Sequence, residues 1–384
     1  MKGSCLYILL ALVLGCKVQA QNDSLKNNKL QLKVGNDQEH QFNNARMLQS
    51  LDSLLHPELR IGGYVSTYYA YYDDEIENNN FVQFPTLAPR NRQFSLNMAL
   101  VSFDYVSEKI RSTIAFHYGD IPESSWPAVF NLIQEAHAGF KVAKHWWLDA
   151  GFFKTHIGLG SFQPRENITS SMSIPDFYDP YYLSGAKLTY YLNDKLSLQA
   201  CIFNGYNEYI DNNHNKALDF TMAYNPNKHW SMTYNFLTCD ETPLPIVTKH
   251  QRYYQNFYVT YQKRRWTLGV DVNFGLQENS LKKDTTKMAS MYAATLVGKF
   301  AFTNKFAMYS RGETFSDPND ILTGKLDIGD YIHGITAGTE YKPYKNMALS
   351  AEWRILQSDK KIFYHTDNFH NQRNEVILCL DLWF

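Results

Sequence analysis

The chain has 384 residues, of which 44% are hydrophobic and 15% are aromatic. Its 37 basic and 38 acidic residues give a formal net charge of −1 at pH 7, which argues against a nucleic-acid partner. The 27 Tyr and 24 Phe are many for a soluble enzyme and suit the aromatic girdles of a membrane β-barrel. The cysteines show no metal-ligand spacing, so no metal site and no cofactor are predicted.

The first twenty residues predict an export signal. Lys2 supplies a positive charge, residues 6–14 form an apolar core too short to span a bilayer, and cleavage is predicted after Ala20. A competing cleavage site of the lipoprotein type ends at Cys16, which would then carry a lipid; cleavage after Ala20 is favoured. No apolar run of about 18 residues follows, so a membrane protein with this sequence must be a closed barrel.

Residues 21–58 predict a polar periplasmic leader, followed by a transmembrane barrel over residues 59–384. Apolar residues at helical spacing between Ala45 and Leu55 predict one short amphipathic helix in the leader. The sequence leaves open whether this helix plugs the barrel or hangs free of it.

From Leu59 onward, apolar and polar residues alternate with a period of two, which predicts strands. In Arg265–Gln277, for example, Trp266 and Phe274 fall on the outward face, whereas Asp271 and Asn273 fall on the inward face. Sixteen such segments are predicted. They begin near Leu59, Arg92, Ile110, Asn131, His145, Tyr181, Leu196, Ala217, His229, Arg252, Trp266, Ala289, Lys305, Tyr331, Met347 and Arg373.

The connections between these segments alternate between short and long. Seven are short, such as Asn193–Lys195, and eight are long, such as Leu159–Pro180. Outer-membrane barrels have this asymmetry, with tight periplasmic turns and longer outside loops. The predicted fold is therefore an all-β, transmembrane, up-and-down antiparallel β-barrel of about 16 strands, with short periplasmic turns and long extracellular loops.

A barrel of this width is expected to leave an aqueous channel. The longest loop, Leu159–Pro180, is third on the outside and is expected to fold inward and narrow the channel, although a solvated surface loop is the alternative. The predicted pore-lining or constriction residues are Arg111, His117, Glu135, His137, Asp149, Lys154, His156, Arg165, Glu166, Lys187, Glu352 and Arg354. Their mixed signs do not indicate cation or anion preference.

Several segments resemble the β-barrel porin-2, or OmpL-like, family. They are Pro89–Tyr105, Gly119–Trp126, Ile133–Phe140, Trp147–Asn167, Asp179–Tyr191 and Phe203–Asn207. The resemblance spans about Leu59 to Asp240. The second half of the chain resembles the family mainly in its strand pattern and in its terminal Phe384. It implies an outer-membrane porin, but it identifies no solute and carries over no catalytic residue.

The predicted function is passive diffusion of small polar solutes through a water-filled porin in the outer membrane of a Gram-negative cell. The alternative is a closed or plugged barrel that acts as a scaffold, an adhesin or a partner-gated transport component. No enzyme is predicted, because no His lies near a Ser in a recognised constellation and no G-x-S-x-G elbow is present. The expected partners are outer-membrane lipid and lipopolysaccharide, the solutes, the barrel-assembly machinery and, as an open alternative, further copies of the chain; no nucleic acid is expected.

Overall fold

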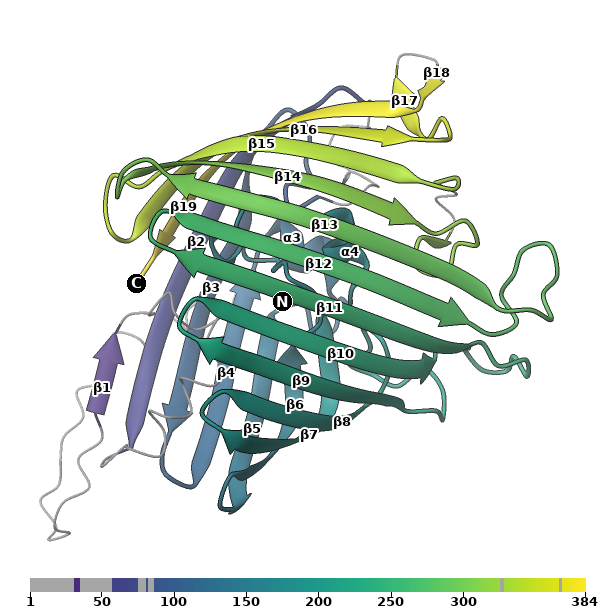
Figure 1. Ribbon diagram of the computed structural model, residues 1–384. Coiled ribbons are helices and arrows are strands. Elements are labelled where there is room, and N and C mark those ends of the chain that lie inside the picture. Colours follow the sequence, from purple (N-terminus) through teal and green to yellow (C-terminus); the bar gives the residue numbers. More distant parts are fainter. Residues whose placement is uncertain (1–30, 35–56, 75–80, 82–85, 325–327, 366–367) are drawn as a thin grey trace, which may run out of the picture.

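The chain forms one closed antiparallel barrel (Figure 1). The computed structural model describes residues 31–34, 57–74, 81, 86–324, 328–365 and 368–384. Its main sheet has 17 strands, of which β1 is an addition and the other sixteen make the barrel. The ring closes where β9 pairs with β10 and where β19 pairs with β2, so every barrel strand has two neighbours. The predicted sixteen-stranded up-and-down barrel is confirmed.

The barrel strands follow one another around the ring in sequence order. They are β2 Glu58–Tyr72, β3 Phe94–Val106, β4 Ile110–Tyr118, β5 Ile133–Ala143, β6 Trp146–Lys154, β7 Tyr182–Asn193, β8 Leu196–Phe203, β9 Ala217–Asn227, β10 Trp230–Asp240, β11 Gln251–Lys263, β12 Trp266–Gln277, β13 Ala289–Ala301, β14 Phe306–Ser316, β15 Ile332–Tyr341, β16 Met347–Ser358 and β19 Gln372–Trp383.

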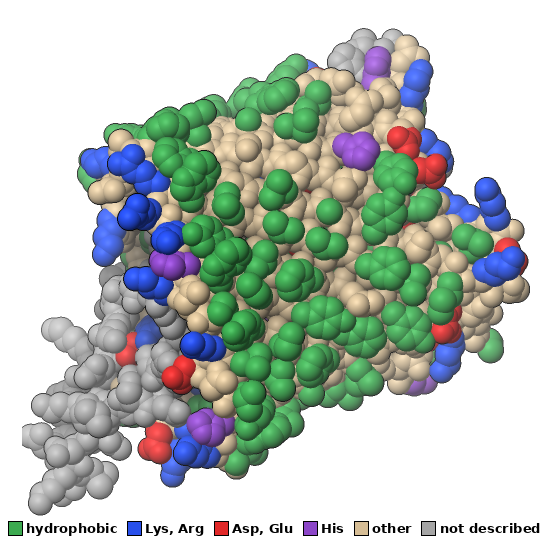
Figure 2. Space-filling model, in the orientation of Figure 1, with side chains coloured by type: hydrophobic (Ala, Val, Ile, Leu, Met, Phe, Trp, Pro, Cys, Tyr) green, Lys and Arg blue, Asp and Glu red, His purple; other side chains and the backbone are tan. Residues whose placement is uncertain are grey.

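Alternation along the strands separates an apolar outside from a polar inside. On β12, Trp266 and Phe274 are exposed, whereas Asp271 and Asn273 are completely buried. The same parity on β16 exposes Trp353. Figure 2 shows hydrophobic side chains spread over the outer surface of the strands, with charged side chains near the two ends of the barrel. A surface of this kind is suited to lipid and not to water.

A charge placed on this outer surface should be costly. Leu296 lies midway along β13 and is 63% exposed, so a Leu296→Arg substitution is expected to destabilise the barrel in lipid by about 2–4 kcal/mol. Urea unfolding in lipid vesicles measures this loss. Ile246→Arg, in the exposed loop after β10, serves as the control and should change the free energy of unfolding little. Equal effects of the two substitutions would contradict a lipid-facing role for Leu296.

The connections sort by barrel end as predicted. Seven short turns lie at one end, and the eight long connections lie at the other. His145 and Arg264 adopt positive φ in two of the short turns. The long connections contain α3 Asp120–Ser125, the 3-10 helix η1 Pro164–Glu166, α4 Ile174–Tyr178 and the hairpin of β17 Phe363–His365 with β18 Asn368–His370. No helix in the described ranges is long and apolar enough to cross a membrane.

A short strand precedes the barrel. β1, Gln31–Val34, pairs in parallel with Glu58–Ile61 of β2. The pairing of β19 with β2 ends near Tyr64 and Gly63, so β1 covers backbone of β2 that β19 does not reach. This strand was not predicted from the sequence. The predicted signal cleavage after Ala20 and the predicted helix between Ala45 and Leu55 lie outside the described residues.

Candidate functional site

The connection between β6 and β7, residues 155–181, folds into the barrel and is called the inward loop here. The backbone N–H of Gly158 donates to Asn256 Oδ1 on β11 at 3.1 Å. The N–H of Leu159 donates to Asp271 Oδ2 on β12, also at 3.1 Å. Because Asn256 and Asp271 are buried and point into the barrel, the loop lies within the lumen, as its length and position predicted.

The inward loop crosses to the wall opposite its own strands. The N–H groups of Ser170 and Ser171 donate to Glu352 Oε2 at 3.1 and 3.2 Å, and the N–H of Ile174 donates to Glu313 Oε2 at 2.6 Å. Arg311 Nη1 donates to the carbonyl oxygen of Ser171 at 2.8 Å. Glu313 and Arg311 belong to β14 and Glu352 belongs to β16, so the loop is fastened at both sides of the ring.

Behind the loop, the wall of β14, β16 and β19 carries a chain of ion pairs, called the charge ladder. It consists of Arg311, Glu313, Arg354, Glu375 and Arg373. Arg354 Nη2 lies 2.9 Å from Glu313, and its Nη1 lies 3.6 Å from Glu375. Arg373 pairs with Glu375 and also with Asp74, at 3.2 Å. The ladder has three bases and two acids, and Asp74 supplies the third acid that balances the charge. Removing one partner from such a buried network is strongly destabilising.

Two of the predicted pore-lining residues lie on this wall, where they are buried from solvent. Glu352 and Arg354 face inward, as predicted, but they are only 3% and 1% exposed. Glu352 holds the backbone of the inward loop, and Arg354 belongs to the charge ladder. In this conformation Glu352 anchors the loop, Arg354 pairs with acids of the wall, and both are almost completely buried.

The opposite wall, on β4 to β6, keeps more contact with solvent. Arg111 Nε donates to Asp149 Oδ1 at 2.6 Å, and the guanidinium lies 4.5 Å from the ring centre of Trp147. Five side chains around this wall and the adjacent part of the loop are between 14% and 20% exposed. They are Arg111, Glu135, His137, Lys154 and Glu166, and they are called the half-exposed group.

Each member of the half-exposed group lies close to a group of opposite type, and Arg111 pairs with the more buried Asp149. His137 Nε2 lies 3.4 Å from Glu135, which also accepts a hydrogen bond of 3.2 Å from the backbone N–H of Lys154. The ammonium of Lys154 pairs with Glu166 in the 3-10 helix of the inward loop. These charges lie next to the loop and retain partial solvent contact.

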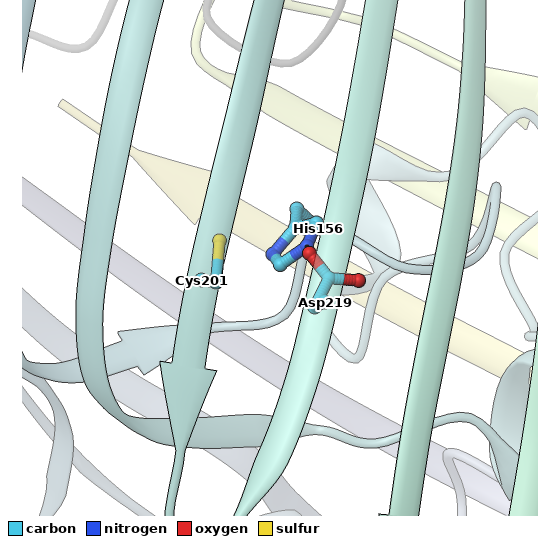
Figure 3. Close-up of side chains that lie close together, drawn as sticks. All are labelled: His156, Cys201 and Asp219. Atoms are coloured by element: carbon cyan, nitrogen blue, oxygen red, sulfur yellow. The ribbon is translucent and has the colours of Figure 1, made fainter.

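His156 stands at the start of the inward loop, close to Cys201 of β8 and Asp219 of β9 (Figure 3). Its Nε2 lies 2.9 Å from Asp219 Oδ2, and Lys187 Nζ lies 3.4 Å from its Nδ1. A Lys187 ammonium that donates to Nδ1 places the ring proton on Nε2, where it faces Asp219. Burial holds the pKa of His156 below its usual value, so the ring is neutral at pH 7. The network is balanced in charge, with Lys187 opposite Asp219.

Two further predicted residues have different surroundings. His117 is 2% exposed and packs against Trp126 with ring centres 4.7 Å apart, so it belongs to the interior packing. The Arg165 guanidinium lies 4.9 Å from the ring centre of Tyr64. Arg165 also lines a cavity of about 10 Å³, roughly the space of one water molecule, near the short-turn end of the barrel. The other charged residues of this cavity are Lys299, Glu340, Lys342 and Asp381.

An aromatic cluster fills the lumen on the side of β3 to β7. Trp126, which follows α3, lies 4.9 Å from Phe162 of the inward loop and 5.4 Å from Tyr182 of β7, measured between ring centres. Tyr209 stacks on Phe152 at 4.2 Å. The loop and this cluster occupy part of the space that the sixteen-stranded wall encloses, so they narrow the lumen at this level.

Some residues of the site were not singled out from the sequence. Asp219 sits between the outward-facing Leu218 and Phe220, so parity alone could have assigned it to the lumen. Arg373 and Glu375 could have been assigned in the same way from the exposed Val376 and Leu378. The aromatic contacts of Trp126 had no signal of this kind, because Trp126 lies in a loop without alternation.

Comparison with known proteins agrees with this geometry. The model of the family described as "Putative beta-barrel porin-2, OmpL-like" matches residues 58–384. The outer membrane channel DcaP of Acinetobacter baumannii superposes with a TM-score of 0.61 at 11% identity, over 85% of this chain and 97% of that chain. The anion-selective porin from Comamonas acidovorans superposes with a TM-score of 0.57 at 9% identity, over 85% of this chain and 100% of that chain.

OmpF of Salmonella typhi, in complex with daunomycin, has a TM-score of 0.55 at 14% identity, over 85% of this chain and 97% of that chain. At these identities the likeness shows a shared fold. No curated protein sequence matches the chain.

Proposed function

Because the chain belongs to the β-barrel porin-2, OmpL-like family and is an outer-membrane porin-like barrel, we propose that it is a narrow diffusion channel for small polar solutes. The observation that carries the proposal is the inward loop, which crosses the lumen and leaves the half-exposed group beside it. Solved barrels of the same fold include a channel and an anion-selective porin, which supports solute passage. Export by residues 1–20, contact with lipopolysaccharide and assembly by the barrel-assembly machinery belong to the proposal.

The charges near the constriction favour weak ion selectivity. Four bases, Arg111, Lys154, Arg165 and Lys187, stand against four acids, Glu135, Asp149, Glu166 and Asp219. In the small cavity below, Lys299 and Lys342 stand against Glu340 and Asp381. Paired charges of opposite sign give a small net potential along the path, so neither cations nor anions are strongly excluded.

Purified protein in a planar bilayer is expected to show steady conductance. In a tenfold KCl gradient, the reversal potential should stay near zero, far from the roughly 59 mV of a perfectly selective pore. A reversal potential near that limit would contradict the charge balance at the constriction. A silent bilayer, with protein that still migrates as a folded barrel, would reject the open channel.

The second candidate is a closed barrel that a partner opens. It is favoured by the fastening of the inward loop to Glu313 and Glu352 and by the deep burial of the charge ladder. A chain that lacks residues 21–57 separates a barrel that the leader closes from the open channel. Conductance that appears only after this truncation supports a leader that closes the barrel, whereas equal conductance of both chains supports the open channel.

A further inference from the structure

Three carboxylates meet where the inward loop touches β12. Asp176 and Asp179 come from the second half of the loop, and Asp271 comes from the strand. Their oxygen atoms lie within 4.8 Å of one another. The three residues are 5%, 1% and 0% exposed, so water does not screen their mutual repulsion.

No base compensates these three acids. In the part of the chain that the structure describes, no Lys, Arg or His forms an ion pair with Asp176, Asp179 or Asp271. By contrast, the buried acids of the charge ladder are paired with buried bases, and Asp219 contacts His156, which in turn contacts Lys187. Burial, followed by the charge of Asp176, raises the pKa of Asp179 well above its usual value. Burial of charged carboxylates without a counter-charge is strongly unfavourable.

One oxygen of the cluster has no partner. Gly160 N–H donates to Asp176 Oδ1 at 2.7 Å, Leu159 N–H donates to Asp271 Oδ2 at 3.1 Å, and the Tyr254 hydroxyl donates to Asp179 Oδ1. Asp179 Oδ2 is buried and accepts no hydrogen bond. A buried oxygen without a donor, inside an acidic cluster, is what a bound cation would satisfy.

The backbone of the loop wraps closely around the cluster. Gly158 has φ +90°, and a Cβ atom there would lie 2.5 Å from Asp179 Oδ2 and 3.0 Å from Asp176 Oδ1. A Cβ atom on Gly160 would lie 2.5 Å from Asp176 Oδ2. Two glycines therefore let the chain approach the carboxylates more closely than any other residue allows.

We propose that Asp176, Asp179 and Asp271 bind a divalent cation of the Ca²⁺ type, which fastens the inward loop to β12. The ligands are all oxygen, and hard cations such as Ca²⁺ prefer oxygen ligands and tolerate irregular geometry. Binding itself does not depend on the proposed channel; only the consequence for conductance rests on that function. Loss of the cation releases this part of the loop and widens the path past it.

The cluster of His156, Cys201 and Asp219 is a weaker candidate for a metal. Its ligand atoms also lie within 4.8 Å of one another. Lys187 already places a cation 3.4 Å from the imidazole, and Asp219 accepts from the other ring nitrogen. A metal ion there would meet a neighbouring positive charge, whereas the three aspartates have none.

The test uses the full chain, purified in detergent, stripped with EDTA and titrated with Ca²⁺ in a calorimeter. We expect one saturable Ca²⁺ site per chain, at least tenfold weaker binding in Asp271→Asn, and unchanged binding in the control Asp330→Asn, an exposed acid of a long loop. If Asp271→Asn does not fold, as judged by heat-modifiable migration, Asp179→Asn provides the same comparison. No saturable binding by the wild type, or equal binding by the cluster variants, overturns the proposal.

A second measurement separates this site from the channel itself. In planar bilayers, EDTA should raise the wild-type conductance and added Ca²⁺ should restore it, while Asp271→Asn should respond to neither. A silent bilayer combined with Ca²⁺ binding that depends on Asp271 would reject the diffusion channel and retain the site. If neither EDTA nor Ca²⁺ changes the wild-type conductance, the cation does not fasten the loop.

Discussion

Replacing residues 159–177 of the inward loop with a short Gly-Ser linker will raise the single-channel conductance several-fold. The replacement removes the segment that reaches Glu352 and Glu313 on the far wall, together with Phe162 of the aromatic cluster. A barrel of sixteen strands without such filling encloses an aqueous passage. Conductance steps in planar bilayers, with wild-type and shortened protein at the same salt concentration, measure the change.

The matched control shortens another long connection. Residues 279–287, between β12 and β13, lie at the same end of the barrel but are largely exposed. Replacing them with the same linker should leave the conductance close to that of the wild type. Unchanged conductance after loss of the inward loop would place the narrowest point elsewhere and would remove the loop from the proposed constriction.

Replacing Arg354 with Met is expected to lower the free energy of unfolding by about 3–5 kcal/mol. Arg354 lies between Glu313 and Glu375, and both carboxylates are fully buried. Loss of the guanidinium leaves Glu313 with Arg311 alone and leaves Glu375 and Asp74 to share Arg373, so the ladder is divided and carries an uncompensated negative charge. Urea unfolding in lipid vesicles, followed by tryptophan fluorescence, measures the loss.

The control for Arg354→Met is Lys345→Met, which removes an exposed base from the short turn before β16. This change should alter stability by less than about 1 kcal/mol. A variant that combines Arg354→Met with Glu375→Gln should regain part of the lost stability, because the remaining charges then form two pairs, Arg311 with Glu313 and Arg373 with Asp74. If Arg354→Met lowers the free energy of unfolding as little as the control does, the buried ion pairs of the charge ladder do not contribute the expected stability.

The sequence predicted the wall of the barrel well, because the wall depends on local patterns. The alternation around Trp266 and Asp271 assigned both faces of β12, and the short turns fixed the strand count. Both signals come from neighbouring residues, and a period of two leaves little choice of face. Strand alternation alone likewise assigns Glu352 and Arg354 to the inner face of β16.

The contents of the lumen could not be predicted in the same way. Ile174 and Glu313 are 139 positions apart, and Leu159 and Asp271 are 112 positions apart. Parity tells which side chains point inward, but it does not tell which of them meet across the ring or what a loop places between them. Strand number likewise sets the diameter of the wall and not the space that remains open. The inward fold of the loop was therefore predicted, whereas its partners on the far wall and the aromatic cluster beside it were not.

The inward loop is held to the far wall by its main-chain amides and also by the hydroxyls of Thr169, Ser170 and Ser171, which bond Arg311 and Ser350. Glu352 and Glu313 accept from the amides of Ser170, Ser171 and Ile174, and every residue type except proline carries such an amide. The amide bonds survive a change of side chain, but Ser170 and Ser171 are buried and their hydroxyls are bonded to the wall, so large residues do not fit there. Redesign of the loop's chemistry is therefore better directed at Arg165, which is not buried, while the segment around Ser170 is kept as the attachment.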